Sequence, residues 1–174
     1  MASATERGRE IVLRGQSLRD ALSSLSKLAE QELPGSVAGY TLVDPTGLFI
    51  KEAMFPSLPP VFQESISLVP VSAPSIGTCV EAIRTGTSVV SNDILADARF
   101  NPKWRDLCLR CGIKSVHSIP IRKEGSLTEG TFVLGYKETG TDALWNRELM
   151  EEFADLAFEA IRLYRTLSVK TAVR

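Results

Sequence analysis

Apolar residues recur at helical spacing near the start of the chain. Within residues 16–33 they lie four, three and four positions apart. They are Leu18, Leu22, Leu25 and Ala29. This spacing places them on one stripe of a helix, and the Pro34-Gly35 pair predicts its end.

A longer helix is predicted from Asp142 to about Leu167, where apolar residues follow a heptad pattern. The main stripe consists of Leu149, Phe153, Leu156, Ala160, Leu163 and Leu167. A second stripe beside it consists of Met150, Ala154, Ala157, Ile161 and Tyr164. Because this apolar surface is wider than packing on one sheet requires, we expect the helix to contact the sheet, the N-terminal helix and a second copy of the chain.

Short runs rich in alternating or β-branched apolar residues predict five strands, and their order with the helices indicates an α/β (α+β) protein. The strands are 37–43, 48–55, 87–91, 114–122 and 130–136. Turn residues at 44–47 and 123–129 join two pairs of these strands into hairpins. Prolines break the segment between 56 and 75, which predicts an irregular crossover with one short helix near 61–66. Further short helices are expected at 76–85 and 102–111.

The composition is typical of one soluble globular domain. The chain has 174 residues, of which 44% are apolar and 24% charged, with 20 basic and 21 acidic side chains. This balance favours neither a nucleic-acid surface nor a membrane surface, and no apolar run approaches the roughly 20 residues that span a bilayer. Three cysteines, an odd number, fit a reducing compartment, so we expect a cytoplasmic protein. We expect a flexible N-terminus at 1–15, one domain at 16–167 and a flexible tail at 168–174.

Several motifs, taken in order, resemble GAF domains of bacterial signalling proteins. They are IGTCVEAIRTGTSVVSNDI at 76–94, WRDL at 104–107, GIKS at 112–115, SIPI at 118–121 and GTFVLGY at 130–136. The resemblance implies a GAF/PAS-like antiparallel sheet of five or six strands. Terminal helices would cover one face, and the crossover would form a ligand pocket on the other. It also implies a regulatory sensor that forms a homodimer through its terminal helices and controls a histidine kinase, a cyclic-di-GMP enzyme or a transcription activator.

The matched motifs would place a set of polar and aromatic residues around a pocket for an unidentified small molecule, with no particular cofactor indicated. The set is Thr78, Cys79, Asn92, Asp93, Trp104, Arg105, Ser115 and His117. Phenylalanines at 55, 62 and 100 would close the mouth of the pocket. Each residue also has a structural interpretation: Asp93 as a loop cap, His117 as a core histidine and Cys79 as a small apolar residue.

Two other functions stay open, and one class is not expected. The double apolar stripe suits a dimerisation module with a degenerate pocket. Cys108 and Cys111, three positions apart on one helix, suit a redox or metal sensor. A single histidine leaves no multi-histidine metal site, and the cysteine motifs of the catalytic free methionine sulfoxide reductases are missing. Lys103 and Trp104 stand where a bilin-binding cysteine would lie in phytochrome-type domains. We therefore expect a protein that is not an enzyme.

Overall fold

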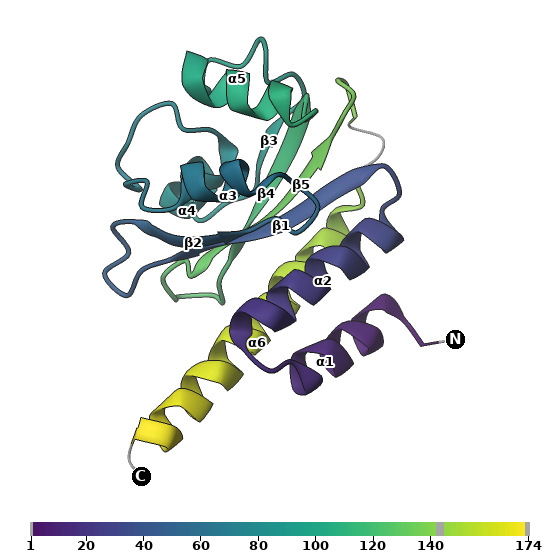
Figure 1. The fold of residues 1–174 in the computed structure, drawn as a ribbon, viewed down its shortest axis with the longest axis vertical. Coiled ribbons are helices and arrows are strands. Elements are labelled where there is room, and N and C mark those ends of the chain that lie inside the picture. Colours follow the sequence, from purple (N-terminus) through teal and green to yellow (C-terminus); the bar gives the residue numbers. More distant parts are fainter. Residues whose placement is uncertain (1, 142–144, 173–174) are drawn as a thin grey trace.

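Five antiparallel strands form one sheet in the computed structural model, which describes residues 2–141 and 145–172 (Figure 1). The strands are β1 (Ser36–Val43), β2 (Ile50–Met54), β3 (Val89–Ser91), β4 (Ser115–Ile121) and β5 (Gly130–Tyr136). Their order across the sheet is β2-β1-β5-β4-β3, so the last strand in the sequence lies at the centre. This arrangement confirms the predicted fold class.

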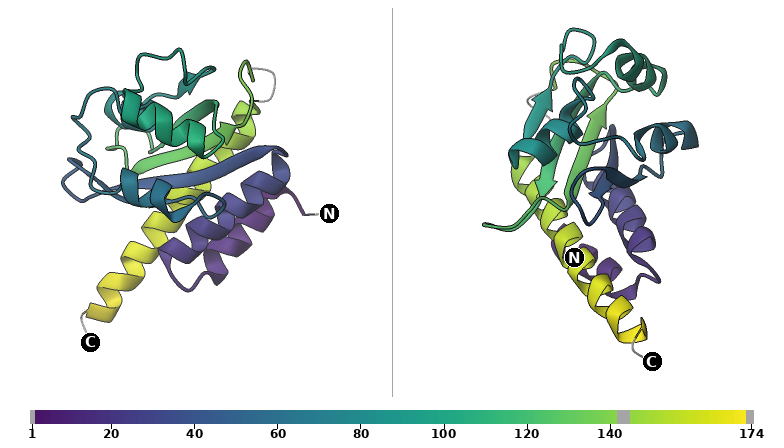
Figure 2. Two further views of the ribbon diagram at one scale, coloured as in Figure 1. Left: turned by 45° about the horizontal axis from the view of Figure 1, so that its top comes forward. Right: turned by 90° about the vertical axis from the view of Figure 1, so that its left-hand side faces the viewer.

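The helices of the described residues cover both faces of the sheet. On one side lie α1 (Ala4–Arg14), α2 (Leu18–Glu32) and α6 (Arg147–Ala172). On the other lie α3 (Pro60–Ile66), α4 (Thr78–Thr85) and α5 (Pro102–Arg110) (Figure 1). The C-terminal half of α6 extends past the edge of the sheet, and α1 lies alongside it (Figure 2). No helix among the described residues is long and apolar enough to span a bilayer.

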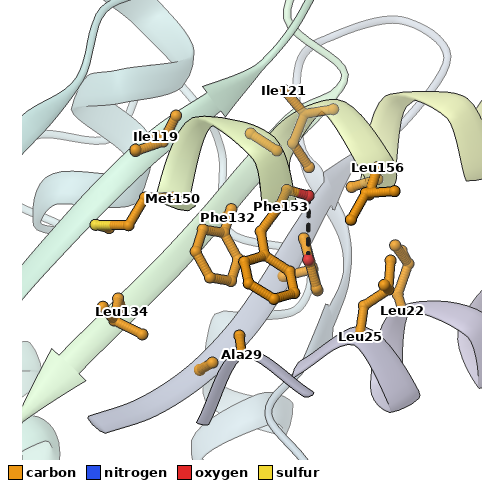
Figure 3. Packing of buried hydrophobic residues seen from close by; sticks show 14 of the residues in the cluster. Leu22, Leu25, Ala29, Ile119, Ile121, Phe132, Leu134, Met150, Phe153 and Leu156 are labelled. Atoms are coloured by element: carbon orange, nitrogen blue, oxygen red, sulfur yellow. Dashed lines mark hydrogen bonds between the residues drawn. The ribbon is translucent and has the colours of Figure 1, made fainter. Parts of the chain in front are cut away.

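The sheet and the terminal helices share a core built on aromatic packing. The rings of Phe132 on β5 and Phe153 on α6 stack with their centroids 5.6 Å apart (Figure 3). Tyr40 on β1 packs against Phe132 at 5.1 Å, and its hydroxyl donates a hydrogen bond of 3.2 Å to the Phe153 carbonyl oxygen. This bond pairs a buried polar atom that would otherwise cost free energy. The cluster fixes α6 across β1 and β5.

The structure differs from the expected flexible N-terminus, because residues 4–14 form helix α1. The Ser3 side chain accepts a hydrogen bond from the Glu6 backbone, and the Glu6 carboxylate accepts one from the Ser3 backbone. This capping box satisfies two backbone donors at the start of the helix. The buried residues of α1 are Gly8 and Val12, which make too small an apolar stripe to indicate a helix from sequence.

Helix α6 also differs at both ends from its predicted range. The Asn146 side chain accepts a hydrogen bond from the Leu149 backbone, which caps the helix just before Arg147. Residues 142–144, included in the predicted helix, lie outside the described residues. At the other end the helix continues through the expected tail as far as Ala172, while residues 173–174 are not described.

Most of the wide apolar surface of α6 is covered within a single copy of the chain. Met150, Ala154, Ala157 and Ile161 of the second stripe are all buried, as are Phe153, Leu156 and Ala160 of the first. The sheet, α2 and α1 provide this cover. Up to Ile161, therefore, the width of the stripes does not require a second copy.

Replacing the central aromatic residue of this core should destabilise the fold. Phe153→Ala leaves a cavity beside Phe132, so we expect the free energy of unfolding to fall by about 3–5 kcal/mol. Val169→Ala, on the same helix but 65% exposed, serves as the matched control and should change it by less than about 0.5 kcal/mol. Urea unfolding monitored by circular dichroism measures both, and equal effects would contradict the assignment of the core.

Candidate functional site

A cavity of about 40 Å³ lies between the sheet and the layer of α3, α4 and α5. Four aromatic rings form part of its wall: Phe55, Phe62, Phe100 and Trp104. Aliphatic residues form most of the remainder: Val37, Ile66, Ile76, Ile113, Val116 and Val133. Thr78, Cys79, Cys108 and Gly135 complete it. The cavity thus receives side chains from the three central strands and from every helix on this face.

Local sequence features bring the aromatic wall together. Asn101 caps α5 by accepting a hydrogen bond of 3.1 Å from the Trp104 backbone, which directs Trp104 and Cys108, one turn apart, into the cavity. Gly77 precedes α4 with a φ of 111°, and a Cβ there would lie 2.6 Å from the Phe100 ring. Only glycine combines that backbone conformation with so close an approach.

The polar atoms of the cavity wall carry no charge at neutral pH. The Thr78 hydroxyl is hydrogen-bonded to the Ser118 hydroxyl at 2.9 Å. Burial raises the pKa of the Cys79 thiol to about 11. Burial, with a smaller contribution from Cys79 and Cys111, raises the pKa of the Cys108 thiol to about 12. Both thiols therefore stay protonated, and the described residues around the cavity offer dispersion contacts rather than ion pairs.

A family model of the GAF domain matches residues 15–162, which is most of the chain. The chain belongs to the GAF domain family. A methyl sulfide methyltransferase-associated sensor from Methanosarcina acetivorans is 28% identical over 130 residues, which are 75% of this chain. The chain spans only 13% of that sensor's length. The family and this relative support a regulatory sensory role.

Solved structures share the fold of this GAF domain at low sequence identity. The GAF domain of the Acinetobacter phosphoenolpyruvate-protein phosphotransferase is 15% identical with a TM-score of 0.68, over 97% of this chain and 99% of that one. A free methionine-R-sulfoxide reductase from Neisseria meningitidis, solved with its substrate, is also 15% identical. Its TM-score is 0.67, over 94% of this chain and 89% of that one.

The second of these similarities corrects the expectation that the chain is not an enzyme. That exclusion was wrong, because the fold of the GAF domain is close to that of a reductase over nearly the whole chain. The missing cysteine motifs of one reductase family do not remove catalysis from the range of functions that this fold supports.

Three residues of the predicted set line the cavity of the GAF domain: Thr78, Cys79 and Trp104. Asn92 and Asp93 lie instead in the loop after β3, where the Asp93 carboxylate accepts a hydrogen bond of 2.9 Å from the Leu95 backbone. This bond closes an Asx turn. Asp93 therefore caps this loop, which is its structural interpretation, and it is not among the residues that line the cavity.

Two further residues of that set serve the surrounding backbone. The Arg105 guanidinium donates to the carbonyl oxygens of Asp97 and Phe100, at 3.2 and 3.0 Å, and so holds the loop before α5. The Ser115 hydroxyl donates to the Glu138 carbonyl oxygen at 2.7 Å. Neither residue is among those that line the cavity.

His117 faces the opposite side of the sheet. Its neighbours Val116 and Ser118 point to the cavity layer, so strand alternation turns the imidazole toward α6. There the ring packs against Trp145 at a centroid distance of 5.3 Å, with the two ring planes at 83°. Neither ring nitrogen has a hydrogen-bond partner among the described residues. Burial, with a smaller contribution from Arg147, lowers the pKa of His117 to about 4.

Cys108 on α5 and Cys111 at its C-cap lie in different environments, although only three positions separate them. Cys108 is buried in the cavity wall, whereas Cys111 is half-buried with a pKa raised chiefly by burial. Within residues 2–141 and 145–172, no group of three His, Cys, Asp or Glu side chains is arranged to hold a metal ion.

Sequence reasoning missed the aliphatic half of the cavity wall. Val116 on β4 and Val133 on β5 line the cavity and alternate along their strands with residues that face the terminal helices, such as Phe132 and Leu134. Alternation along β4 puts Val116 on the face opposite His117, but it does not indicate which of the two faces borders a cavity. A choice of polar residues from sequence motifs does not include apolar wall residues such as Val116 and Val133.

Protonation of His117 should make stability depend on pH in a defined window. The pKa is about 4 in the folded chain and 6.5 in the unfolded one, so the unfolded chain binds the proton first. The free energy of unfolding should therefore fall by roughly 3 kcal/mol as pH drops from 6.5 to 4. His117→Phe should flatten this window, because His117 is the sole histidine of the sequence.

Urea unfolding at half-unit pH steps measures this effect. Asp44 and Asp97, whose pKa values are lowered to about 2, lose most of their stabilising contributions between pH 3.8 and 2, and they do so equally in the wild type and in His117→Phe. Equal slopes for the wild type and His117→Phe would show that the imidazole titrates normally.

The two cavity thiols should resist alkylation in the folded chain. A pKa of about 12 instead of 9 for Cys108 lowers the thiolate fraction about a thousandfold at pH 8. Iodoacetamide labelling with and without urea, read by mass spectrometry for each cysteine, should show Cys108 slowed most and Cys111 least. Rapid labelling of Cys108 in the folded chain would instead support the redox hypothesis.

Proposed function

We propose that this GAF domain is a regulatory sensor that binds a small molecule in the cavity and passes the signal to an effector through α2 and α6. The observation that carries the proposal is the double role of β5. Val133 and Gly135 line the cavity, while Phe132 and Leu134, which alternate with them along the strand, pack into the core of the terminal helices. One central strand thus contacts both the proposed ligand and α6.

The path from the cavity to α6 consists of direct contacts. A molecule against Val133 presses on β5 one residue away from Phe132, and the Phe132 ring stacks on Phe153 of α6. The Tyr40 hydroxyl donates a hydrogen bond to the Phe153 carbonyl oxygen, so β1 is also coupled to a movement of α6. A ligand shifts α6 only if it binds more tightly to one arrangement of this contact than to another.

The proposed output is a change at the free end of α6. This end extends past the sheet (Figure 2), and Val169 on it is 65% exposed. We propose that two copies of the chain pair at this end of α6. The effector would be a histidine kinase, a cyclic-di-GMP enzyme or a transcription activator. The sensor from Methanosarcina acetivorans supports such a role for a GAF region within a longer protein. Three free cysteines support a reducing, cytoplasmic location.

Filling the cavity should imitate an occupant and alter the terminal helices. Val133→Ile adds one methylene to the cavity wall, so we expect amide hydrogen exchange in α2 and α6 to change several-fold while the fold is kept. Val71→Ile is the matched control, since Val71 belongs to the same apolar cluster but does not line the cavity. Hydrogen exchange read by mass spectrometry compares both variants with the wild type.

If Val133→Ile changes the amide hydrogen exchange of α2 and α6 no more than Val71→Ile does, the cavity is not coupled to these helices. The domain would then act as a dimerisation module with a degenerate pocket.

A further inference from the structure

The cavity offers nothing to balance a charged ligand. Among the described residues that line it, none is acidic or basic, and both thiols stay protonated. Moving an ionised group from water into such a site costs several kcal/mol without a partner.

The side chains of the wall also offer little hydrogen-bonding capacity. Thr78, which is 2% exposed, shares a hydrogen bond with Ser118, with 2.9 Å between their hydroxyl oxygens. A ligand with several donors and acceptors would leave them unpaired in the cavity, and each would cost roughly 1–3 kcal/mol. Nucleotides, amino acids and nitrate therefore lack the contacts they need.

The size of the cavity limits the ligand further. A volume of about 40 Å³ exceeds the roughly 15 Å³ that one water needs, and is well below the roughly 150 Å³ of an apolar cavity that takes up benzene. An occupant of a few heavy atoms fits without rearrangement of the wall.

The wall is also polarisable. Four aromatic rings and two sulfur atoms surround the space, with Phe55 and Phe62 packed edge to face at a centroid distance of 5.0 Å. Sulfur and aromatic groups gain most from dispersion with soft, apolar partners. Such a wall favours a ligand without strong hydrogen-bonding groups over a trapped water.

From these four features we infer that the ligand of the cavity is a small, uncharged, apolar molecule of a few heavy atoms, of the class of light hydrocarbons. The inference rests on the proposed sensory function and names the chemistry that the sensor detects. It excludes the nucleotide and amino-acid classes from this site.

Xenon and cyclopropane are suitable probes, because both are small, uncharged and apolar. Titration of the whole chain with each gas should raise its melting temperature in a saturable way, and crystals under xenon pressure should show the atom between Trp104 and Val133. Val133→Ile should lose most of this binding, whereas Val71→Ile should keep it. Cyclic AMP, glutamate and nitrate, tested in parallel, should leave the melting temperature unchanged.

A double variant separates an apolar ligand from a polar one. Thr78→Val with Ser118→Ala removes both hydroxyls together, which leaves no unpaired partner. Binding of both gases should be kept or strengthened. A loss of gas binding in this variant, or a shift with cyclic AMP, glutamate or nitrate, would overturn the inference.

The same measurements distinguish this inference from the proposed function. If the gases bind but the hydrogen exchange of α2 and α6 stays unchanged, the ligand class holds and the signalling path fails. If neither gas binds while Val133→Ile still changes the exchange of α6, the path holds and the ligand class is overturned.

Discussion

Strand β5 is the constraint on which the rest of the structure depends. All seven of its residues are buried, because it lies at the centre of the sheet with a layer of helices on each face. At its start, Gly130 approaches β1 so closely that a Cβ would lie 1.9 Å from the Thr41 carbonyl oxygen. The strand therefore has little freedom to move alone, and any change on one of its faces must be taken up on the other.

The two faces of β5 differ in the size of their side chains. Phe132 and Leu134 fill the space toward α6, whereas Val133 and Gly135 leave space toward the other helices. A Cβ on Gly135 would lie 3.0 Å from Ile113, so this position sets how near that side chain can come. Large residues on one face and small ones on the other explain why the cavity lies on the α3–α5 side.

Strand alternation and helical spacing were enough to predict most of this architecture. The sheet, α2 and most of α6 follow from patterns that extend over several turns or residue pairs. Helix α1 did not, because its contacts depend on Gly8 against Leu156 and on ion pairs such as Arg7 with Glu32. Such contacts have no periodic signature in a single sequence.

The candidate site was harder to predict than the fold for a related reason. The motifs drew attention to polar residues, and several of these proved to hold loops, as Asp93 and Arg105 do. The cavity itself is mainly apolar, and apolar wall residues have the same appearance in a sequence as core residues. Only the three-dimensional arrangement shows that Val116 and Val133 border a space while Ile119 and Phe132 do not.

The geometry of α6 determines how far a change at β5 can travel. The helix is fixed to the sheet at Phe153, and three turns later the Tyr164 hydroxyl donates to the carbonyl oxygens of Val12 and Gly15. Arg165 forms an ion pair with Glu129, just before β5. Since a helix moves nearly as a rigid body over this distance, a tilt at Phe153 must also displace the turn between α1 and α2. The N-terminal helices and the free end of α6 would then respond together to what occupies the cavity.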